Sequence, residues 1–329
     1  MRRYVRRLAI LGFVVIAAWA GGAVQPAAAQ ADAYPNRPVK LVVGFAAGGP
    51  SDLLARIIGQ WLTERLGQQF VIENRPGAGS NIATEAVVNA SPDGYTILIV
   101  ATGNAINTSF YDKLPFDFVR DIAPVAGLAR VPSVMAINPS LPAKTVAEFI
   151  TYGKANPGKI NAASGGTGTA VHLAAELFKT MTGVNLVHVP YRGLAPAMTD
   201  LISGQVQLMF GDMPSAIQHI RSGSIRGLAV TTAARSAIMP DLPTVAETVP
   251  GYEASAWFGL GAPKGTPPAI VAKLNREVNA GLSDAKLSER IEKLGAAPIV
   301  VTPLEFETFI AAETRKWAAA VKASGAKAE

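Results

Sequence analysis

The chain has 329 residues, 49% of them hydrophobic, and it carries 30 basic and 24 acidic side chains but no cysteine. The lack of cysteine excludes a disulfide framework, a thiol nucleophile and a lipid-attachment cysteine. Residues 1–31 hold four arginines and no acid, so without them the formal net charge of +6 falls to +2 and no basic stripe for nucleic acid remains. The length that is left predicts two domains.

The first 31 residues have the pattern of a secretory signal peptide, with a basic start, an apolar middle and a small-residue Ala-x-Ala end. Gly12, Gly21 and Gly22 interrupt the apolar stretch, which favours a cleaved signal over a transmembrane anchor. We expect cleavage after Ala29 or Ala31 and a protein that is free in the periplasm.

After the leader, apolar strands alternate with amphipathic helices. The first series is predicted as strand 39–45, helix 52–67, strand 70–74, helix 81–90 and strand 95–100, followed by a small-residue turn, ATGNA. Continuous apolar strands alternating with helices predict a parallel sheet that is covered on both faces.

Prolines break this pattern, and the segment 131–138 is predicted to be extended. A second series comes next, with strands at 159–164, 185–189, 205–210 and 225–231 and helices at 170–181, 195–203 and 214–222. Beyond a proline-rich stretch we expect strand 256–263, helices 267–282 and 283–295, strand 297–301 and a last helix at 303–322. The order predicts a discontinuous first domain, 32–133 plus 256–329, and a second domain, 134–255, joined by two crossings.

Two glycine-rich turns, one in each series, lie between a strand and a helix. In the first, Gly48 and Gly49 precede Pro50, and in the second, GGTGT follows the strand that ends near Ser164. Helix starts of this kind leave free N–H groups that attract anions. The alternative is that the glycines only turn the chain and that Ser51 or Asp52 caps its helix. Because the turn occurs twice, we expect one ligand to be clamped between the two domains.

Other kinds of site have little support. Neither Gly166-x-Gly168 nor Gly77-x-Gly79 has the third glycine of a dinucleotide fingerprint. There is also no G-x-S-x-G elbow, and no pair of histidines has metal-ligand spacing, so we expect no cofactor and no metal. His172 is predicted to contact the ligand or, alternatively, to support its own turn. Asp212 follows a strand, where it can contact a ligand or cap its loop.

Several long stretches, in order, resemble one family: YPNRPVKLVVGFAAGGPSDLLAR, ENRPGAGSNIATEAVVNASPDGYTIL, NAASGGTGTAVHLAAELF, VPYRGLAPAMTDLISGQVQLMF and PSAIQHIRSGSIRGLAVTT. They are similar to the solute-binding proteins of tripartite tricarboxylate transporters, the Bug family. The resemblance implies a type II periplasmic-binding-protein fold, or Venus flytrap, in which two α/β domains hold a small carboxylate in the cleft between them.

The same resemblance implies a monomer that delivers its ligand to a membrane permease and is not an enzyme. The ligand is expected to be a dicarboxylate, a tricarboxylate or an aromatic carboxylate, and the sequence does not choose among them. The rival hypotheses are a hydrolase or lyase acting on a carboxylate in the same cleft, and a binder of a compact oxyanion such as phosphate. The implied ligand-binding residues are Phe45, Ala47, Gly48, Gly49, Ser51, Asp52, Thr102, Asn104, Ser164, Gly165, Gly168, Thr169, His172, Tyr191 and Asp212.

Overall fold

The computed structural model describes residues 34–236, 238–325 and 327, so the predicted signal peptide and its cleavage site lie outside the described residues. The chain from Pro35 onward forms one compact unit. Within the described residues, no helix has both the length and the apolar character needed to cross a membrane.

The first series forms a parallel arrangement, as predicted. Strand β1 (Val39–Val43) pairs in parallel with β2 (Phe70–Asn74) on one side and with β3 (Thr96–Ala101) on the other. The connecting helices are α2 (Pro50–Leu66) and α3 (Asn81–Val88).

The predicted turn ATGNA is wrong. Helix α4 (Thr102–Phe110) begins directly at the end of β3, because the side chain of Asn104 accepts a hydrogen bond from the Ala101 N–H at 2.8 Å and so caps the first turn. The short helix α5 (Phe118–Asp121) completes this part of the chain.

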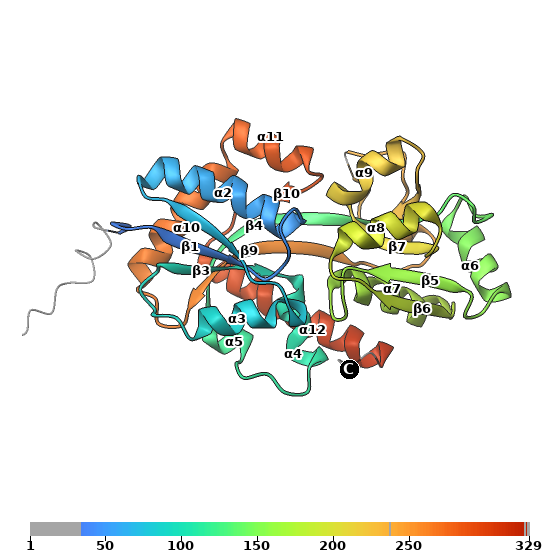
Figure 1. Ribbon diagram of the computed structural model, residues 1–329, viewed down its shortest axis with the longest axis horizontal. Helices are drawn as coiled ribbons and strands as arrows, with labels where there is room; N and C mark the ends of the chain where they lie inside the picture. Colours follow the sequence, from blue (N-terminus) through green and yellow to red (C-terminus); the bar gives the residue numbers. More distant parts are fainter. Residues whose placement is uncertain (1–33, 237, 326, 328–329) are drawn as a thin grey trace, which may run out of the picture. The chain divides into compact units, whose positions relative to one another are not determined.

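Two long strands carry the chain between the two series. Strand β4 (Ile122–Ile137) is antiparallel to β9 (Ser255–Pro263) over residues 122–132. Over residues 133–137 it is antiparallel to β7 (Leu208–Asp212) and β8 (Arg226–Val230) instead. Figure 1 shows β4 and β9 crossing between the blue-green and the yellow-green elements. The predicted extended segment 131–138 is therefore the second half of a longer strand.

The second series repeats the first in its topology. Its central strand β5 (Ile160–Ser164) pairs in parallel with β6 (Leu186–Pro190) and β7 (Leu208–Asp212), and β8 (Arg226–Val230) lies on the other side of β4. The helices are α6 (Val146–Ala155), α7 (Ala170–Thr182), α8 (Leu194–Ser203) and α9 (Met213–Arg221). The antiparallel β4 makes the sheet mixed, which the sequence pattern did not reveal.

The C-terminal segment returns to the first series. It contains α10 (Pro268–Leu282), α11 (Ala285–Lys293), the two-residue strand β10 (Ala297–Pro298) and α12 (Pro303–Ser324). Strand β10 pairs with β4 and is much shorter than the predicted strand 297–301.

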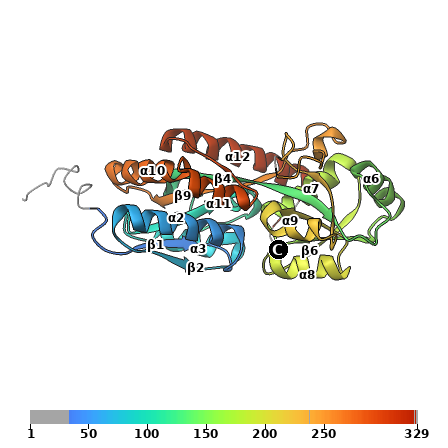
Figure 2. The same cartoon turned by 90° about the horizontal axis from the view of Figure 1, so that it is seen from above.

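Helix α12 packs on both hydrophobic cores. Phe306 and Ile310 belong to the core around β3 and Trp257, whereas Trp317 belongs to the core around β5 and β7. The helix lies along β4 and reaches α7 (Figure 2). Between the two cores, Glu313 Oε2 accepts hydrogen bonds from the indole N–H groups of Trp257, at 2.9 Å, and Trp317, at 3.0 Å.

Within the described residues, eight strands pair along one path, β2-β1-β3-β9-β4-β7-β5-β6, and β8 and β10 pair with β4 off this path. The partners of β4 change between Pro132 and Ser133, next to the predicted domain boundary. The division into two domains remains a proposal, because α12 and the end of α4 also contribute to the core of the second series.

Candidate functional site

The first glycine turn is held by the side chain of Asp52. Its Oδ2 atom accepts the Gly48 N–H at 3.0 Å and the Arg56 Nε at 2.9 Å, and its Oδ1 atom accepts from Asn74 Nδ2 at 3.0 Å. Burial acts to raise the pKa of Asp52, but the hydrogen bonds from Arg56, Gly48 and Asn74 outweigh it and lower the pKa. The carboxylate therefore holds the turn, although the start of α2 has no side-chain cap.

A second loop of the first series, residues 77–80, also borders the candidate site, and the sequence analysis did not predict it. Its backbone is left-handed at two residues that are not glycine, Ala78 (φ 46°) and Ser80 (φ 81°). Such conformations cost free energy and often occur at ligand sites. Ser80 lies directly against Gly44 at the end of β1, where no Cβ would fit. The glycines of RPGAGS were the only signal in the sequence.

The start of α4 is tied to its neighbours by polar side chains. Asn104 Nδ2 donates to Thr84 Oγ1 at 2.8 Å, and Thr84 Oγ1 donates to the Ser80 carbonyl at 2.9 Å. Thr102 Oγ1 accepts the Trp257 N–H at 2.8 Å. The side chains of Thr102 and Asn104 therefore position these loops.

In the second series, hydroxyl groups organise the glycine turn. Thr169 Oγ1 donates to the Gly166 carbonyl at 2.8 Å and accepts the His172 N–H at 3.3 Å. Ser164 Oγ lies 2.7 Å from His188 Nε2 and also contacts Gly166. These contacts fix the turn directly before α7. The first backbone N–H groups of that helix have no partner within the helix and point out of its N-terminal end.

The His172 side chain supports the turn through a hydrogen bond. Its Nδ1 atom accepts the Gly168 N–H at 3.2 Å, and its ring stacks on His188 with centroids 3.8 Å apart. Burial, with the nearby His188 and Lys179, lowers the pKa of His172 to about 3, and burial with Lys179 lowers the pKa of His188 to about 4. Both rings are therefore neutral near pH 7, as the accepting Nδ1 requires, and the supporting role predicted for His172 is favoured.

We expect His172→Ala to weaken ligand binding several-fold and to lower the melting temperature, because the Gly168 N–H loses its acceptor and the stacked ring is removed. Calorimetric titration and a thermal melt measure the two effects. If the variant lost as much affinity as a substitution at Gly168 itself, the histidine would be in direct contact with the ligand.

The glycine turn of the second series meets α4 of the first. A Cβ placed on Gly168 would lie 3.0 Å from Phe110 Cδ1 and 3.2 Å from Asn107 Oδ1. On the first-series side, Asn107 Nδ2 donates to the Gly79 carbonyl at 2.8 Å. The loop 77–80, the helix α4 and the turn before α7 thus converge on Asn107.

Tyr191 borders the same turn. Its N–H donates to the Ser164 carbonyl at 3.0 Å, and its hydroxyl donates to Asp200 Oδ2 at 2.6 Å. Burial and the Asp200 carboxylate raise the pKa of Tyr191 to about 12, so the phenol stays protonated.

Asp212 ends β7 at the same edge of the sheet, beside the crossing strand. It is only 6% exposed, and Ser133 Oγ donates to its Oδ1 atom at 3.2 Å. Burial raises the pKa of Asp212 to about 6, and no charged side chain in the described part of the chain offsets this effect. Asp212 does not cap α9 with its side chain.

The structure thus brings the second glycine turn together with α4 and the loop 77–80. Among the described residues, the contacts of Gly48 and Gly49 do not join the first glycine turn to the second. The predicted glycines have only backbone groups to offer a ligand: Gly48, Gly49, Gly165 and Gly168. Other predicted residues use their side chains for hydrogen bonds within the protein: Asp52, Thr102, Asn104, Ser164, Thr169, His172 and Tyr191. Phe45 lies beside Gly103 at the start of α4, Ser51 is buried and Ala47 is exposed. The residues missed by the sequence reasoning are Ser80, Asn81 and Asn107.

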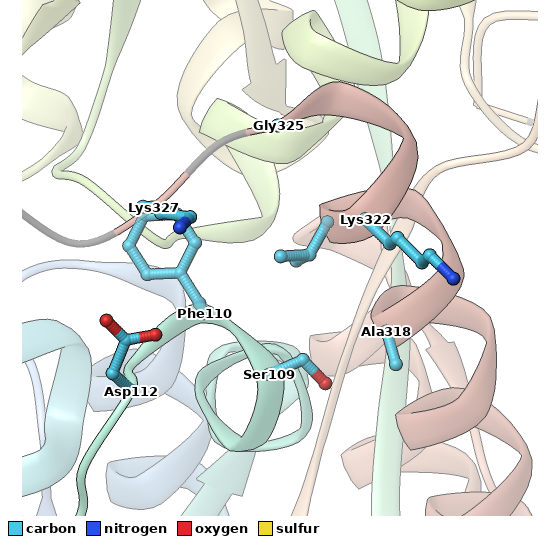
Figure 3. A pocket seen from close by; sticks show the side chains of 8 residues that line it. Ser109, Phe110, Asp112, Ala318, Lys322, Gly325 and Lys327 are labelled. Carbon is cyan, nitrogen blue, oxygen red and sulfur yellow. The ribbon is translucent and has the colours of Figure 1, made fainter.

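A separate cavity of about 280 Å³ lies between the end of α4 and the end of α12 (Figure 3). Its lining includes Ser109, Asp112, Lys322 and Lys327, together with Phe110, the residue whose ring also borders Gly168. The lysines are exposed, so the cavity has no buried charge with which to hold a ligand.

Comparisons with known proteins agree on one family. The model of the tripartite tricarboxylate transporter family receptor matches residues 54–326. Protein BugT of Bordetella pertussis is 38% identical over 325 residues, 98% of each chain. The structure of R. palustris Rpa4515 with adipate has a TM-score of 0.86 and 41% identity, covering 89% of this chain and 98% of that one. The periplasmic binding protein BugD has a TM-score of 0.84 and 37% identity, covering 90% and 100%.

Proposed function

Because the chain belongs to the tripartite tricarboxylate transporter family of receptors, we propose that it captures a small carboxylate and delivers it to a membrane permease of that transporter type. It is a solute-binding protein with the fold of the periplasmic binding proteins. The family consists of receptors and not enzymes, so the hydrolase or lyase alternative is set aside.

The contact between Ser164 and His188 does not revive the enzyme hypothesis. A serine hydroxyl 2.7 Å from an imidazole has the distance of a nucleophile and its base. Ser164 is only 1% exposed, however, and its hydroxyl also hydrogen bonds to both backbone groups of Gly166. The pair therefore holds the turn.

The observation that carries the proposal is the meeting of two helix starts at Asn107. The turn that ends at Gly168 opens α7, and the loop that ends at Ser80 opens α3. Each helix start offers backbone N–H groups and the positive end of a helix dipole, which favour an anion. The solved relative that contains adipate, a dicarboxylate, supports this class of ligand.

We further propose that the ligand closes two domains around it. The domains are 32–133 plus 256–329 and 134–255, and the hinge lies where β4 exchanges its partners and where β9 begins. The mature protein acts as a monomer in the periplasm after removal of residues 1–31. Release by osmotic shock and an N-terminus at Gln30 or Asp32 would support this; retention in the membrane fraction after a high-salt wash would contradict it.

The test compares a carboxylate with its uncharged amide. At about one hundred times its dissociation constant, a dicarboxylate such as succinate or adipate should stabilise the protein by about 2.7 kcal/mol. The corresponding diamide should stabilise it far less, because it lacks the charge that the helix starts favour. Thermal shift over a panel of carboxylates, with their amides, measures this difference.

Inorganic phosphate is the control for the oxyanion alternative. If phosphate displaces the carboxylate and stabilises the protein as much as the carboxylate does, the site is built for a compact oxyanion. If an amide stabilises as much as its acid, the helix starts do not bind the ligand's charge and the proposal fails.

A further inference from the structure

The amide side chains of Asn81 and Asn107 form a buried pair at the start of α3. Asn107 Nδ2 donates to Oδ1 of Asn81 at 2.8 Å and to the Gly79 carbonyl at 2.8 Å. A carbonyl can only accept, so the contact with Gly79 fixes which end of the Asn107 amide carries the NH₂ group. The contact between the two amides then fixes the orientation of Asn81.

Each amide keeps one atom without a hydrogen-bond partner in the described part of the chain. These are Nδ2 of Asn81, a donor, and Oδ1 of Asn107, an acceptor, on residues that are 7% and 1% exposed. A buried polar atom left unpaired costs about 1–3 kcal/mol, and native proteins pair most of them. An open donor and an open acceptor on contacting side chains therefore indicate a bound group from outside the chain.

The pair lies at the point where the candidate site converges. Asn107 Oδ1 is 3.2 Å from the position that a Cβ of Gly168 would occupy. Asn81 is the first residue of α3 and directly follows Ser80, whose hydroxyl is also buried without a partner among the described residues. The open atoms thus lie beside both helix starts that are proposed to bind the carboxylate.

We infer that the Asn81–Asn107 pair recognises a hydroxyl group on the ligand, so that hydroxycarboxylates are the preferred substrate class; this rests on the proposed function. A hydroxyl donates one hydrogen bond and accepts others, so it satisfies both open atoms. A carboxylate only accepts and an ammonium group only donates, so each leaves one atom unpaired. A methylene group leaves both unpaired.

The first experiment titrates matched ligands into the wild-type protein by calorimetry. One series is succinate, malate and aspartate, and the other is adipate, 2-hydroxyadipate and 2-aminoadipate. Within a series the members differ at one substituent, hydrogen, hydroxyl or ammonium. We expect the hydroxylated member to bind at least tenfold more tightly than the other two in one series or both, because sites that hydrogen bond to a substrate hydroxyl discriminate strongly against analogues that lack it.

The second experiment changes the donor without changing the shape. Asn81→Asp keeps Oδ1, which accepts from Asn107, and replaces the open donor by an anionic acceptor. Two acceptors now face the ligand, so the preference should move from the hydroxylated to the ammonium-bearing member of the series by at least tenfold. Burying the new carboxylate should lower the melting temperature, although the start of the helix offsets part of this cost, so the variant is judged by the ranking of its ligands and not by its stability. Asn89→Asp adds the same charge at the exposed end of α3 and should leave the ranking unchanged.

If all members of both series bind equally well, or the hydroxylated members do not lead in either, the pair holds only water and the inference is overturned. An unchanged ranking in Asn81→Asp overturns it as well. Both results leave carboxylate binding itself intact. The failure of the proposed function is a different result, in which no carboxylate of the thermal-shift panel stabilises the wild-type protein.

Discussion

Replacing Gly168 with valine should remove most ligand binding while the protein still unfolds in one cooperative transition. Gly168 has a φ of +78°, a left-handed conformation that costs an L-residue roughly 1–2 kcal/mol. Its added side chain would also begin 3.0 Å from the ring of Phe110 and 3.2 Å from Asn107. Because the substitution acts where the two series meet, we expect the dissociation constant to rise by roughly a hundredfold or more, which corresponds to about 2.7 kcal/mol.

Gly183 provides the matched control for this substitution. It ends α7, the same helix that Gly168 precedes, with a similar φ of +72°, and nothing lies within 4 Å of its Cβ position. Gly183→Val should lower the melting temperature through backbone strain and leave the affinity for the carboxylate unchanged. If Gly168→Val bound as tightly as the wild type, the meeting of α4, the loop 77–80 and the turn before α7 would not be the ligand site.

Replacing Asp212 with asparagine should stabilise the protein at neutral and alkaline pH. Burial raises the pKa of Asp212 from 3.8 to about 6, so the folded state holds its proton more strongly than the unfolded state does. The corresponding stability is complete below pH 3.8 and is lost as the pH rises through 6. At pH 8 the wild type therefore carries a buried charge that the variant lacks, and we expect the variant to gain about 1–3 kcal/mol there.

The measurement is the free energy of unfolding of both proteins from pH 4 to pH 8. The difference should be small near pH 4 and should grow up to about pH 7. His172 and His188 also titrate below their usual range, but they are present in both proteins, so the difference isolates Asp212. Asp241→Asn, which removes one exposed carboxylate, is the control for the loss of a single negative charge. A variant that is less stable than the wild type at pH 8 would mean that the Asp212 charge has a favourable partner.

The alternation of strands and helices was determined by the sequence alone. Apolar runs such as VKLVV and amphipathic helices such as Pro50–Leu66 arise from the local period of the side chains, and glycines mark the strand-to-helix turns. The same local signals predicted both glycine turns. The family resemblance, which rests on long ordered motifs, added the ligand class and the fold.

Tertiary structure decided which polar side chains remain open to a ligand. Asp52 and Asn104 have the residue types of binding groups, yet both hydrogen bond to side chains that are distant in the chain, Asn74 and Thr84 respectively. Asn107 resembles any helical asparagine in the sequence, and only the packing of Gly79 and Gly168 around it leaves its oxygen buried and unpaired among the described residues. Local pattern fixes where a helix begins, because that depends on neighbouring residues, whereas the hydrogen-bonding atoms that a side chain keeps open depend on groups that are far away in the sequence.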